Sequence, residues 1–468
     1  MGERRGSDLP IVRDQLGREP TTHFTVVARC PGGHPLVIRN DPVDAQGRPF
    51  PTLFWLTCRA AVKAVSRLES EGWIGRFKAR AEEDPAFAEA LAAAHEDYAR
   101  ERSRGFAQAL GWGGVGGTGV GVKCLHAHYA NHLAGGPDPV GASVAERVEP
   151  VHPEEAPGRV AAVDLGTNSI RLLVASGRRD ASGRTNGSLD EFARDMVITR
   201  IGQGVERTGR IDPEALARTV GVLARYCRRA RALHAGRIRV AATAAVREAS
   251  NREELEAAVR EHAGSELQVI GGEREAGLSF LGATRGLDAP APFLILDIGG
   301  GSTELVMGTD RPDAATSTPM GSVWLTEQLV RSDPPSEEDL AAARRAVAGI
   351  LDEASRIVPV RDARTFVAVA GTATTVQAIS LGLTFYDPEA IHRTWLSVAE
   401  AERVLGGLAR MTNPERAAIP VMAPGRGDVI VAGAIILVEA MRRFGFDRAL
   451  VSEADILDGL ALEMLETL

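Results

Sequence analysis

The chain has 468 residues, of which 44% are hydrophobic, and its 54 basic and 62 acidic residues give a formal net charge of −8. This length predicts two or three domains that each bury a core, and the acidic balance argues against nonspecific nucleic-acid binding. The apolar run at residues 429–438 lies between Asp428 and Glu439 and is too short to span a bilayer. Four cysteines in a chain of this length do not make a disulfide framework. We therefore expect a cytoplasmic protein without nucleic-acid or membrane partners.

The composition changes near residue 150. Residues 1–148 hold six of the ten histidines and three of the four cysteines, and residues 149–157 contain three prolines. The proline-rich stretch predicts a linker after an N-terminal domain.

Within the N-terminal part, residues 59–80 and 81–104 are rich in charge and predict two solvated helices. Five side chains in this part are of types that bind a transition metal such as Zn²⁺: Cys30, Cys58, Cys124, His126 and His128. Because no Cys-x-x-Cys pair is present and cysteines often pack as small apolar groups, burial in the core is the favoured alternative.

Beyond the linker, short apolar runs alternate with longer segments of helical periodicity. Strands are expected at residues 160–165, 170–175, 238–242, 267–270, 293–298 and 366–369. Asp212 and Pro213 predict a capped helix with Cys227 on its apolar face, the stretch 250–253 predicts a capping box, and residues 336–355 predict an amphipathic helix. This alternation predicts an α/β architecture with a largely covered sheet.

Two segments of the chain echo each other. The sequence VDLGTNS at residues 163–169 and the sequence LDIGGGS at residues 296–302 each place an aspartate before a turn of small residues, and Asp164 and Asp297 are 133 positions apart. The repetition predicts two related subdomains that face each other across a cleft. Either turn alone could be merely a tight connection between strands.

The chemistry of these turns suits phosphate. Glycine lets backbone N–H groups approach anionic oxygens closely, and small hydroxyl and amide residues add donors. The two aspartates could hold Mg²⁺ while it keeps several of its waters. Arginine offers a planar fork that matches phosphate, and Arg171 and Arg247 lie close to the predicted turns.

Residues 158–468 resemble the exopolyphosphatase and guanosine-pentaphosphate phosphohydrolase family of the actin-like superfamily. Six segments carry the resemblance in the order of that family: 163–171 (VDLGTNSIR), 242–247 (ATAAVR), 270–276 (IGGEREA), 296–304 (LDIGGGSTE), 369–374 (VAGTAT) and 424–428 (PGRGD). Any one of them is weakly specific, but together they are highly specific.

The resemblance implies roles for individual residues. Glu275 would be the catalytic base, rather than Glu273, with Asp297 and Glu304 as acidic residues needed for metal binding and catalysis. Asp164, Asp297 and Glu304 would hold Mg²⁺ or Mn²⁺. The residues implied in phosphate binding are Thr167, Asn168, Ser169, Arg171, Arg247, Gly299, Gly300, Gly301, Ser302, Gly371, Thr372 and Arg426.

The same resemblance predicts an α/β fold of two actin-like, ribonuclease H-like subdomains, formed by residues 158–287 with 451–468 and by residues 288–450. It implies release of orthophosphate from polyphosphate or from the 5′ end of guanosine pentaphosphate, by a homodimer. Longer members continue into a further helical domain, so the end at Leu468 favours short polyphosphate chains. An actin-like kinase or ATPase, and an alarmone-binding regulator without catalysis, remain alternatives.

Residues 20–145 resemble an uncharacterised bacterial domain family. The segments that carry this resemblance are 29–35 (RCPGGHP), 49–58 (PFPTLFWLTC), 113–117 (GGVGG), 122–130 (VKCLHAHYA) and 135–141 (GGPDPVG). The resemblance implies a separate α+β domain and no particular activity.

Overall fold

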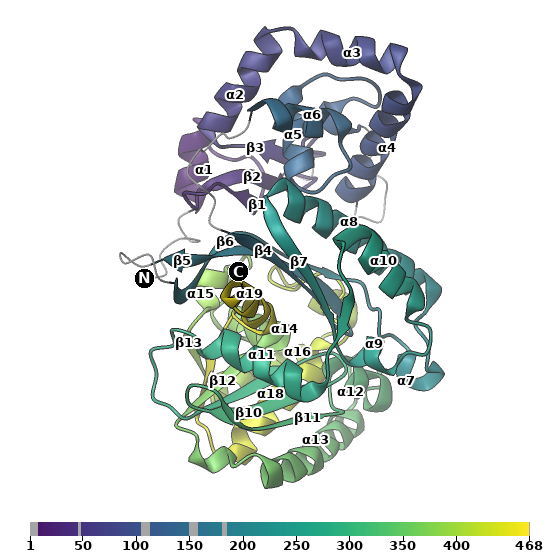
Figure 1. Ribbon diagram of the computed structural model, residues 1–468. Helices are drawn as coiled ribbons and strands as arrows, with labels where there is room; N and C mark the ends of the chain where they lie inside the picture. Colours follow the sequence, from purple (N-terminus) through teal and green to yellow (C-terminus); the bar gives the residue numbers. More distant parts are fainter. Residues whose placement is uncertain (1–7, 45–47, 104–112, 149–157, 180–184, 468) are drawn as a thin grey trace.

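The computed structural model describes residues 8–44, 48–103, 113–148, 158–179 and 185–467, and the linker expected at 149–157 lies outside these ranges (Figure 1). Across the described ranges, none of the helices combines the length and the apolar character that crossing a bilayer requires.

The N-terminal module, residues 8–148, is an α+β unit in which a small sheet lies next to the rest of the chain and helices form the remainder of the module (Figure 1). Its three strands form an antiparallel sheet in the order β1-β2-β3. The elements are α1 (Asp8–Leu16), β1 (Phe24–Arg29), β2 (Pro35–Asn40), β3 (Phe54–Leu56), α2 (Arg59–Ser70), α3 (Trp73–Glu83), α4 (Pro85–Arg102), the 3-10 turn η1 (Val115–Gly117), α5 (Leu125–Leu133) and α6 (Pro139–Val148).

The prediction of two charged helices at residues 59–80 and 81–104 is wrong in its boundaries. The structure has three helices, because Gly72 adopts a left-handed conformation with φ of 82° and Asp84 with Pro85 starts a new helix. The last helix, α4, is also not merely a solvated face, since His95 and Tyr98 on it are buried.

The first lobe is built on a five-stranded sheet with the order β6-β5-β4-β7-β8. Its elements are β4 (Arg159–Leu165), β5 (Ser169–Arg179), β6 (Thr185–Ile198), α7 (Val205–Thr208), α8 (Pro213–Ala232), β7 (Ala235–Ala242), α9 (Ala244–Glu248), α10 (Glu253–Ala263), β8 (Leu267–Val269) and α11 (Gly272–Thr284), joined by the final helix α19 (Ile456–Glu466). The central strand β4 is buried throughout, as its continuous apolar run predicts.

Two helix starts in this lobe had sequence signals, and one of the two predictions is confirmed. Asp212 caps α8 by accepting hydrogen bonds from the backbone N–H groups of Glu214 and Ala215, both at 3.0 Å, and Cys227 is fully buried on that helix. The capping box expected at residues 250–253 is wrong. Ser250 Oγ instead donates to the carbonyl of Gly209 at 2.9 Å, so this turn secures the loop that leads into α8.

The second lobe has a six-stranded sheet with the order β11-β10-β9-β12-β14-β13. Its elements are β9 (Phe293–Ile298), β10 (Thr303–Gly308), β11 (Pro312–Thr318), α12 (Ser322–Leu329), α13 (Glu337–Ile357), the 3-10 turn η2 (Val360–Asp362), β12 (Thr365–Val369), α14 (Ala370–Ser380), α15 (Pro388–Ile391), β13 (Thr394–Ser397), α16 (Val398–Ala409), α17 (Asn413–Ala417), α18 (Ile430–Phe444) and β14 (Arg448–Val451). The amphipathic helix predicted at residues 336–355 is α13, capped by Ser336.

The two sheets repeat one pairing pattern, which confirms the internal echo in the sequence. In each lobe the first two strands form an antiparallel hairpin, a third strand pairs antiparallel with the second, and two later strands (β7 and β8, or β12 and β14) extend the sheet in parallel from the first. The second lobe adds β13 as an antiparallel edge strand. The two hairpin turns also match in detail. Gly166 N donates to Ser169 O at 2.9 Å, and Gly299 N donates to Ser302 O at 3.0 Å.

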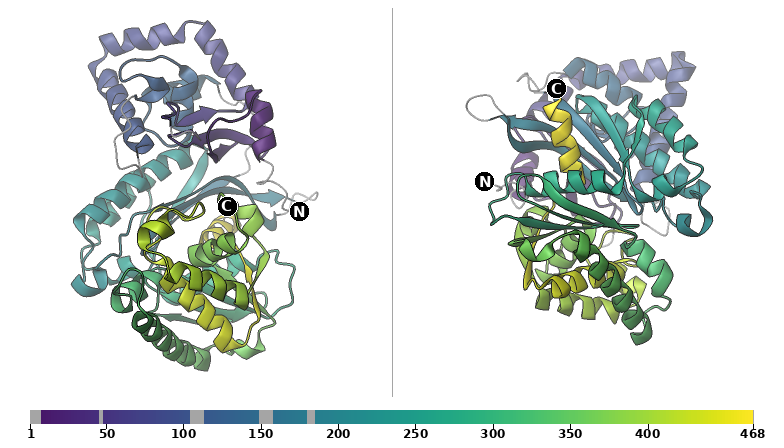
Figure 2. Two further views of the ribbon diagram at one scale, coloured as in Figure 1. Left: turned by 180° about the vertical axis from the view of Figure 1, so that it is seen from behind. Right: turned by 60° about the horizontal axis from the view of Figure 1, so that its bottom comes forward.

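Helices α11 and α19 lie side by side between the two sheets (Figure 2). Leu278 of α11 packs into the core of the first lobe with α19, whereas Phe280 packs against the second sheet. The two helices approach closely at glycines: a Cβ at Gly282 would lie 1.9 Å from the carbonyl oxygen of Asp455, and a Cβ at Gly459 would lie 2.0 Å from that of Leu278. Helix α11, expected to belong to the first subdomain, therefore contacts both lobes.

We expect Gly282→Ala to destabilise the protein and to lower its activity. The added methyl group overlaps a backbone carbonyl that cannot rotate away, and such overpacking costs about 1–3 kcal/mol or more. The matched control is Gly277→Ala on the same helix, where a Cβ meets nothing within 4 Å. That change should raise stability by about 0.5–1 kcal/mol, because alanine favours the helix. Thermal melting of both variants checks the prediction, and equal effects would contradict it.

The N-terminal module is joined to the first lobe by a shared apolar core and by arginines of α8. Arg229 bonds to the carbonyl of Val27 in the module and forms an ion pair with Asp195, and Arg225 Nη2 lies 2.5 Å from Asp97 Oδ2. The module also touches the second lobe, where the rings of His23 and Phe385 have centroids 5.6 Å apart.

Candidate active site

The two hairpin turns predicted to bind phosphate face each other directly. A Cβ at Gly300 would lie 3.1 Å from Thr167 Cβ, and a Cβ at Gly301 would lie 2.8 Å from Thr167 Oγ1. The carbonyl of Gly300 is in turn held by the first N–H groups of α12, from Val323 at 2.9 Å. The turns are therefore fixed on both sides, and the side chain of Thr167 occupies the space next to Gly300 and Gly301.

Four carboxylates gather beside these turns, and each comes from a different element. Asp164 lies on β4, Glu275 in the first turn of α11, Asp297 on β9 and Glu304 on β10. All four are buried. Asp297 and Glu304 are directly paired across the antiparallel strands, so their side chains lie on one face of the sheet.

Burial and mutual repulsion change the acidity of this group. Burial is the main cause that raises the pKa of Glu275, and the carboxylate of Glu304 raises that pKa further. Burial, followed by the charge of Asp297, likewise raises the pKa of Glu304. Such shifts are typical of functional sites, because structural positions rarely retain crowded buried acids.

The structure distinguishes the two glutamates of the segment 270–276. Glu273 is exposed, whereas Glu275 is buried and lies near the charge of Arg247. Arg247 itself is held by its Nη1 donating to the carbonyl of Ile270 at 2.7 Å. The placement fits Glu275 as the group that activates water; this role stays a prediction.

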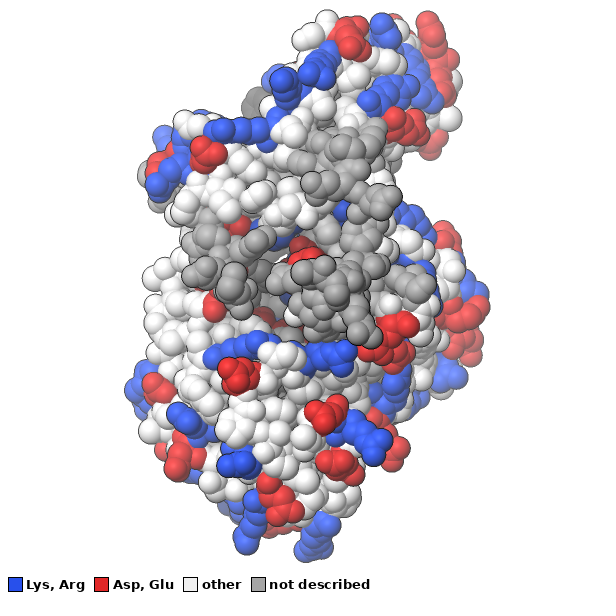
Figure 3. All heavy atoms as spheres, turned by 60° about the vertical axis from the view of Figure 1, so that its left-hand side comes forward, with Lys and Arg blue, Asp and Glu red and all other residues white. Residues whose placement is uncertain are grey.

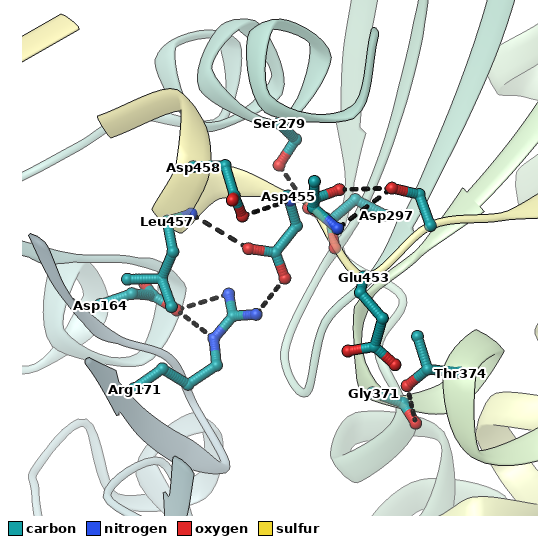
Figure 4. Close-up of polar contacts among 12 residues, drawn as sticks. Asp164, Arg171, Ser279, Asp297, Gly371, Thr374, Glu453, Asp455, Leu457 and Asp458 are labelled. Atoms are coloured by element: carbon teal, nitrogen blue, oxygen red, sulfur yellow. Dashed lines mark hydrogen bonds and ion pairs between the residues drawn. The ribbon is translucent and has the colours of Figure 1, made fainter. Parts of the chain in front are cut away.

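Arg171 is fixed between two carboxylates (Figure 4). Its Nη2 donates to Asp164 Oδ2 at 2.7 Å, and its Nη1 pairs with Asp455 Oδ2. Asp455 caps α19 by accepting a hydrogen bond from Leu457 N at 3.0 Å. The guanidinium is therefore held by the first lobe and by the returning C-terminal helix together.

The segment 369–374 forms the start of α14, a position suited to an anion. The first N–H groups of a helix have no intrahelical partner and attract negative charge. Arg426 lies over this start: a Cβ at Gly371 would lie 2.3 Å from its Nη2, and its Nη1 donates to Thr375 Oγ1 at 2.7 Å. Thr372 is buried in the first turn. The guanidinium of Arg426 and the N-terminus of α14 therefore both favour binding of an anion between the lobes.

The carboxylate group fits a divalent cation. Asp164 Oδ1 and Glu275 Oε2 are buried and have no hydrogen-bond partner among the described residues. Among those same residues, Asp164, Asp297 and Glu304 do not form a set of three oxygens within 4.8 Å of one another. A cation at this position would therefore take some ligands from water or substrate, as Mg²⁺ commonly does.

Several residues that shape this site had no predicted role. Ser279 donates to Asp297, and Ser317 Oγ donates to Glu304 Oε1 at 2.7 Å. Asp455 is the most consequential omission, since it fixes Arg171. One signal for it exists, because Asp455 and Asp458 form a capping box before the last apolar helix.

The five metal-ligand candidates of the N-terminal module do not converge on one point. His128 is fully buried and its Nδ1 lies 2.9 Å from Asp138 Oδ2. Cys30 and Cys58 are buried, as the alternative of core packing predicts. In the described part of the chain, the three donors that come within 4.8 Å of one another belong to Glu69, Cys124 and His126.

Several known proteins resemble the two lobes. Exopolyphosphatase 2 of Mycobacterium tuberculosis is 45% identical over 316 residues, which are 65% of this chain and 98% of that protein. The crystal structure of an exopolyphosphatase-like protein matches with a TM-score of 0.62 and 36% identity, covering 66% of this chain and 99% of its own. A Ppx/GppA family member from Aquifex aeolicus matches with a TM-score of 0.56 and 27% identity, covering 66% and 98%.

Two families account for the described modules. Residues 26–146 match DUF501, a protein family of unknown function, so the N-terminal module is a distinct domain, as expected. Residues 182–468 match the Ppx/GppA phosphatase family, whose solved structures confirm the predicted two-lobed actin-like fold. The chain therefore belongs to the Ppx/GppA phosphatase family and is a hydrolase.

Proposed function

We propose that the chain hydrolyses a terminal phosphoanhydride, releasing orthophosphate from the end of inorganic polyphosphate or from the 5′ end of guanosine pentaphosphate. One observation carries the proposal: a buried carboxylate, Glu275, lies with three more acids beside two glycine-containing turns that face each other. The similarity to exopolyphosphatase 2 of Mycobacterium tuberculosis supports polyphosphate as substrate.

Each group of residues would have its own role in the in-line attack of water on the terminal phosphorus. In the turns at 166–169 and 299–302, backbone N–H groups other than those of Gly166 and Gly299 cradle the terminal phosphoryl group. Arg171 and Arg426 neutralise the oxygens of the phosphate chain. Glu275 takes a proton from the attacking water, so that the water oxygen can form a bond to phosphorus. The bond to the bridging oxygen breaks, and that oxygen leaves with the shortened chain.

A divalent cation is the cofactor expected for this chemistry, and members of the family generally depend on one. We propose Mg²⁺ or Mn²⁺, held by Asp164, Asp297 and Glu304. Bound there, the cation would offset the repulsion between carboxylates and neutralise negative charge on the phosphate chain.

The experiment that tests the proposal measures phosphate release from polyphosphates of defined length and from guanosine pentaphosphate, without an acceptor. We expect release from at least one of these substrates with Mg²⁺ and a loss of release, by roughly 10²-fold or more, when the cation is chelated, because the carboxylates then repel each other and the substrate. A length series also tests the expected preference for short chains. Transfer to an acceptor alone would indicate a kinase, and tight binding without release would indicate a regulator.

The cellular setting follows as part of the proposal. The four cysteines form no disulfide, which supports a reducing compartment, the cytoplasm. Figure 3 shows acidic and basic side chains interspersed over one face rather than a continuous basic surface, in keeping with a substrate other than nucleic acid.

The homodimer stays a prediction that light scattering on the purified protein would test.

A further inference from the structure

The N-terminal module holds a cluster of ligand atoms far from the carboxylates of the two lobes. Glu69 lies in the last turn of α2, Cys124 directly precedes α5, and His126 lies in the first turn of α5. His126 Nδ1 lies 3.2 Å from Glu69 Oε1 and 3.8 Å from Cys124 Sγ. A carboxylate oxygen, a thiol sulfur and an imidazole nitrogen therefore point at one small volume.

Contacts to Nε2, the ring nitrogen on the other side from Glu69 and Cys124, orient the imidazole of His126. His126 Nε2 lies 3.1 Å from the carbonyl oxygen of Val62 and 3.1 Å from Ser66 Oγ, both on α2. A carbonyl oxygen can only accept a hydrogen bond, so Nε2 carries a proton, and a metal ion would displace any proton on Nδ1 and take its lone pair on the side of sulfur and carboxylate. An outer hydrogen bond of this kind, from the second ring nitrogen to a carbonyl, is how metal-binding histidines are usually held.

The helices bring these donors together for a structural reason. Val62, Ser66 and Glu69 follow one another at helical spacing on the face of α2 that receives His126. Glu69 Oε1 also accepts a hydrogen bond from Leu125 N at 2.7 Å and so caps α5. The carboxylate is thus fixed at the start of α5, beside Nδ1 of His126.

Three electron-rich atoms converge here, and a cation would satisfy all of them. We propose that Glu69, Cys124 and His126 form a binding site for a single transition-metal ion of the Zn²⁺ class. A thiolate, an imidazole and a carboxylate are the three ligand types that Zn²⁺ takes in proteins, and they exclude Mg²⁺ as the preferred occupant.

The site is also open to exchange and to a fourth ligand. The side chains of His126 and Glu69 are 22% and 26% exposed, so an ion can enter from solvent. Three protein donors leave one tetrahedral position for water or an added ligand, as in sites where zinc acts on other molecules. This inference is independent of the reaction in the cleft.

Cobalt binding to the full-length protein tests the site. Co²⁺ replaces Zn²⁺ and gives a thiolate charge-transfer absorption, which the carboxylates of the cleft cannot produce. We expect one thiolate-bound Co²⁺ per chain, displaced by one equivalent of Zn²⁺. Cys124→Ser should abolish the absorption, and His126→Gln and Glu69→Gln should each weaken Zn²⁺ affinity by at least about 10-fold, since even outer-shell changes cost this much.

The control is Cys30→Ser, which makes the same change at a buried cysteine outside the cluster and should leave the absorption in place. Circular dichroism of each variant shows whether it folds. The proposal is wrong if folded wild-type protein gives no thiolate absorption with Co²⁺. It is equally wrong if the absorption survives in Cys124→Ser but is lost in Cys30→Ser.

Discussion

Replacing Glu275 with glutamine should abolish phosphate release while leaving the protein folded. The amide has the size of the carboxylate but cannot take a proton from water, and loss of a general base typically lowers a rate by about 10²–10⁴-fold. Folding should not suffer, because the change removes one of four crowded acids from a buried position. Steady-state kinetics with polyphosphate and a thermal melt of the same preparation measure both effects.

The matched control is two residues away. Glu273 lies on the same helix but is exposed, so Glu273→Gln should retain turnover close to that of the wild type. If Glu275→Gln kept near-normal turnover, or if both variants lost activity equally, Glu275 would not be the base.

Replacing Arg171 with methionine should both destabilise the protein and remove activity. The guanidinium pairs with Asp164 and Asp455, whose side chains are only 4% and 5% exposed. Removing one partner of a buried ion pair leaves uncompensated charge and costs about 3–5 kcal/mol. We expect the first thermal transition to fall by about 6–20 °C, since 1 kcal/mol corresponds to about 2–4 °C in domains of this size.

Two further variants distinguish the loss of the Arg171 ion pairs from a nonspecific loss of stability. Arg237→Met changes an exposed arginine of the same sheet and should shift stability by no more than about 0.5 kcal/mol. The double variant Arg171→Met with Asp455→Asn should melt higher than Arg171→Met alone, because it removes part of the unpaired charge. A double variant that melts lower would show that Asp455 acts on stability through other contacts.

The sequence predicts those features of the fold and of the site that are local in the chain. The turns at 166–169 and 299–302, their aspartates and the cap at Asp212 are each specified within a few residues, and the structure has them where the pattern indicates. Their repetition at a spacing of 133 residues also predicted two related lobes.

What the sequence could not predict depends on contacts between distant segments. Asp455 meets Arg171 across 284 positions, and Glu69 meets His126 across 57, so no local spacing relates the partners. The capping box predicted at Ser250 is wrong for the same reason. The local sequence fits a capping box, but the serine hydroxyl donates its hydrogen bond to the distant carbonyl of Gly209 instead.

The N-terminal module is attached to the first lobe and would move together with it. Its apolar core continues into the first lobe, and it also meets the second lobe at the tilted rings of His23 and Phe385. Rotation of the lobes apart, to admit substrate or let product go, would carry the module with the first lobe and pull these rings from each other. The distance between the rings of His23 and Phe385 would therefore report how far the two lobes have rotated apart.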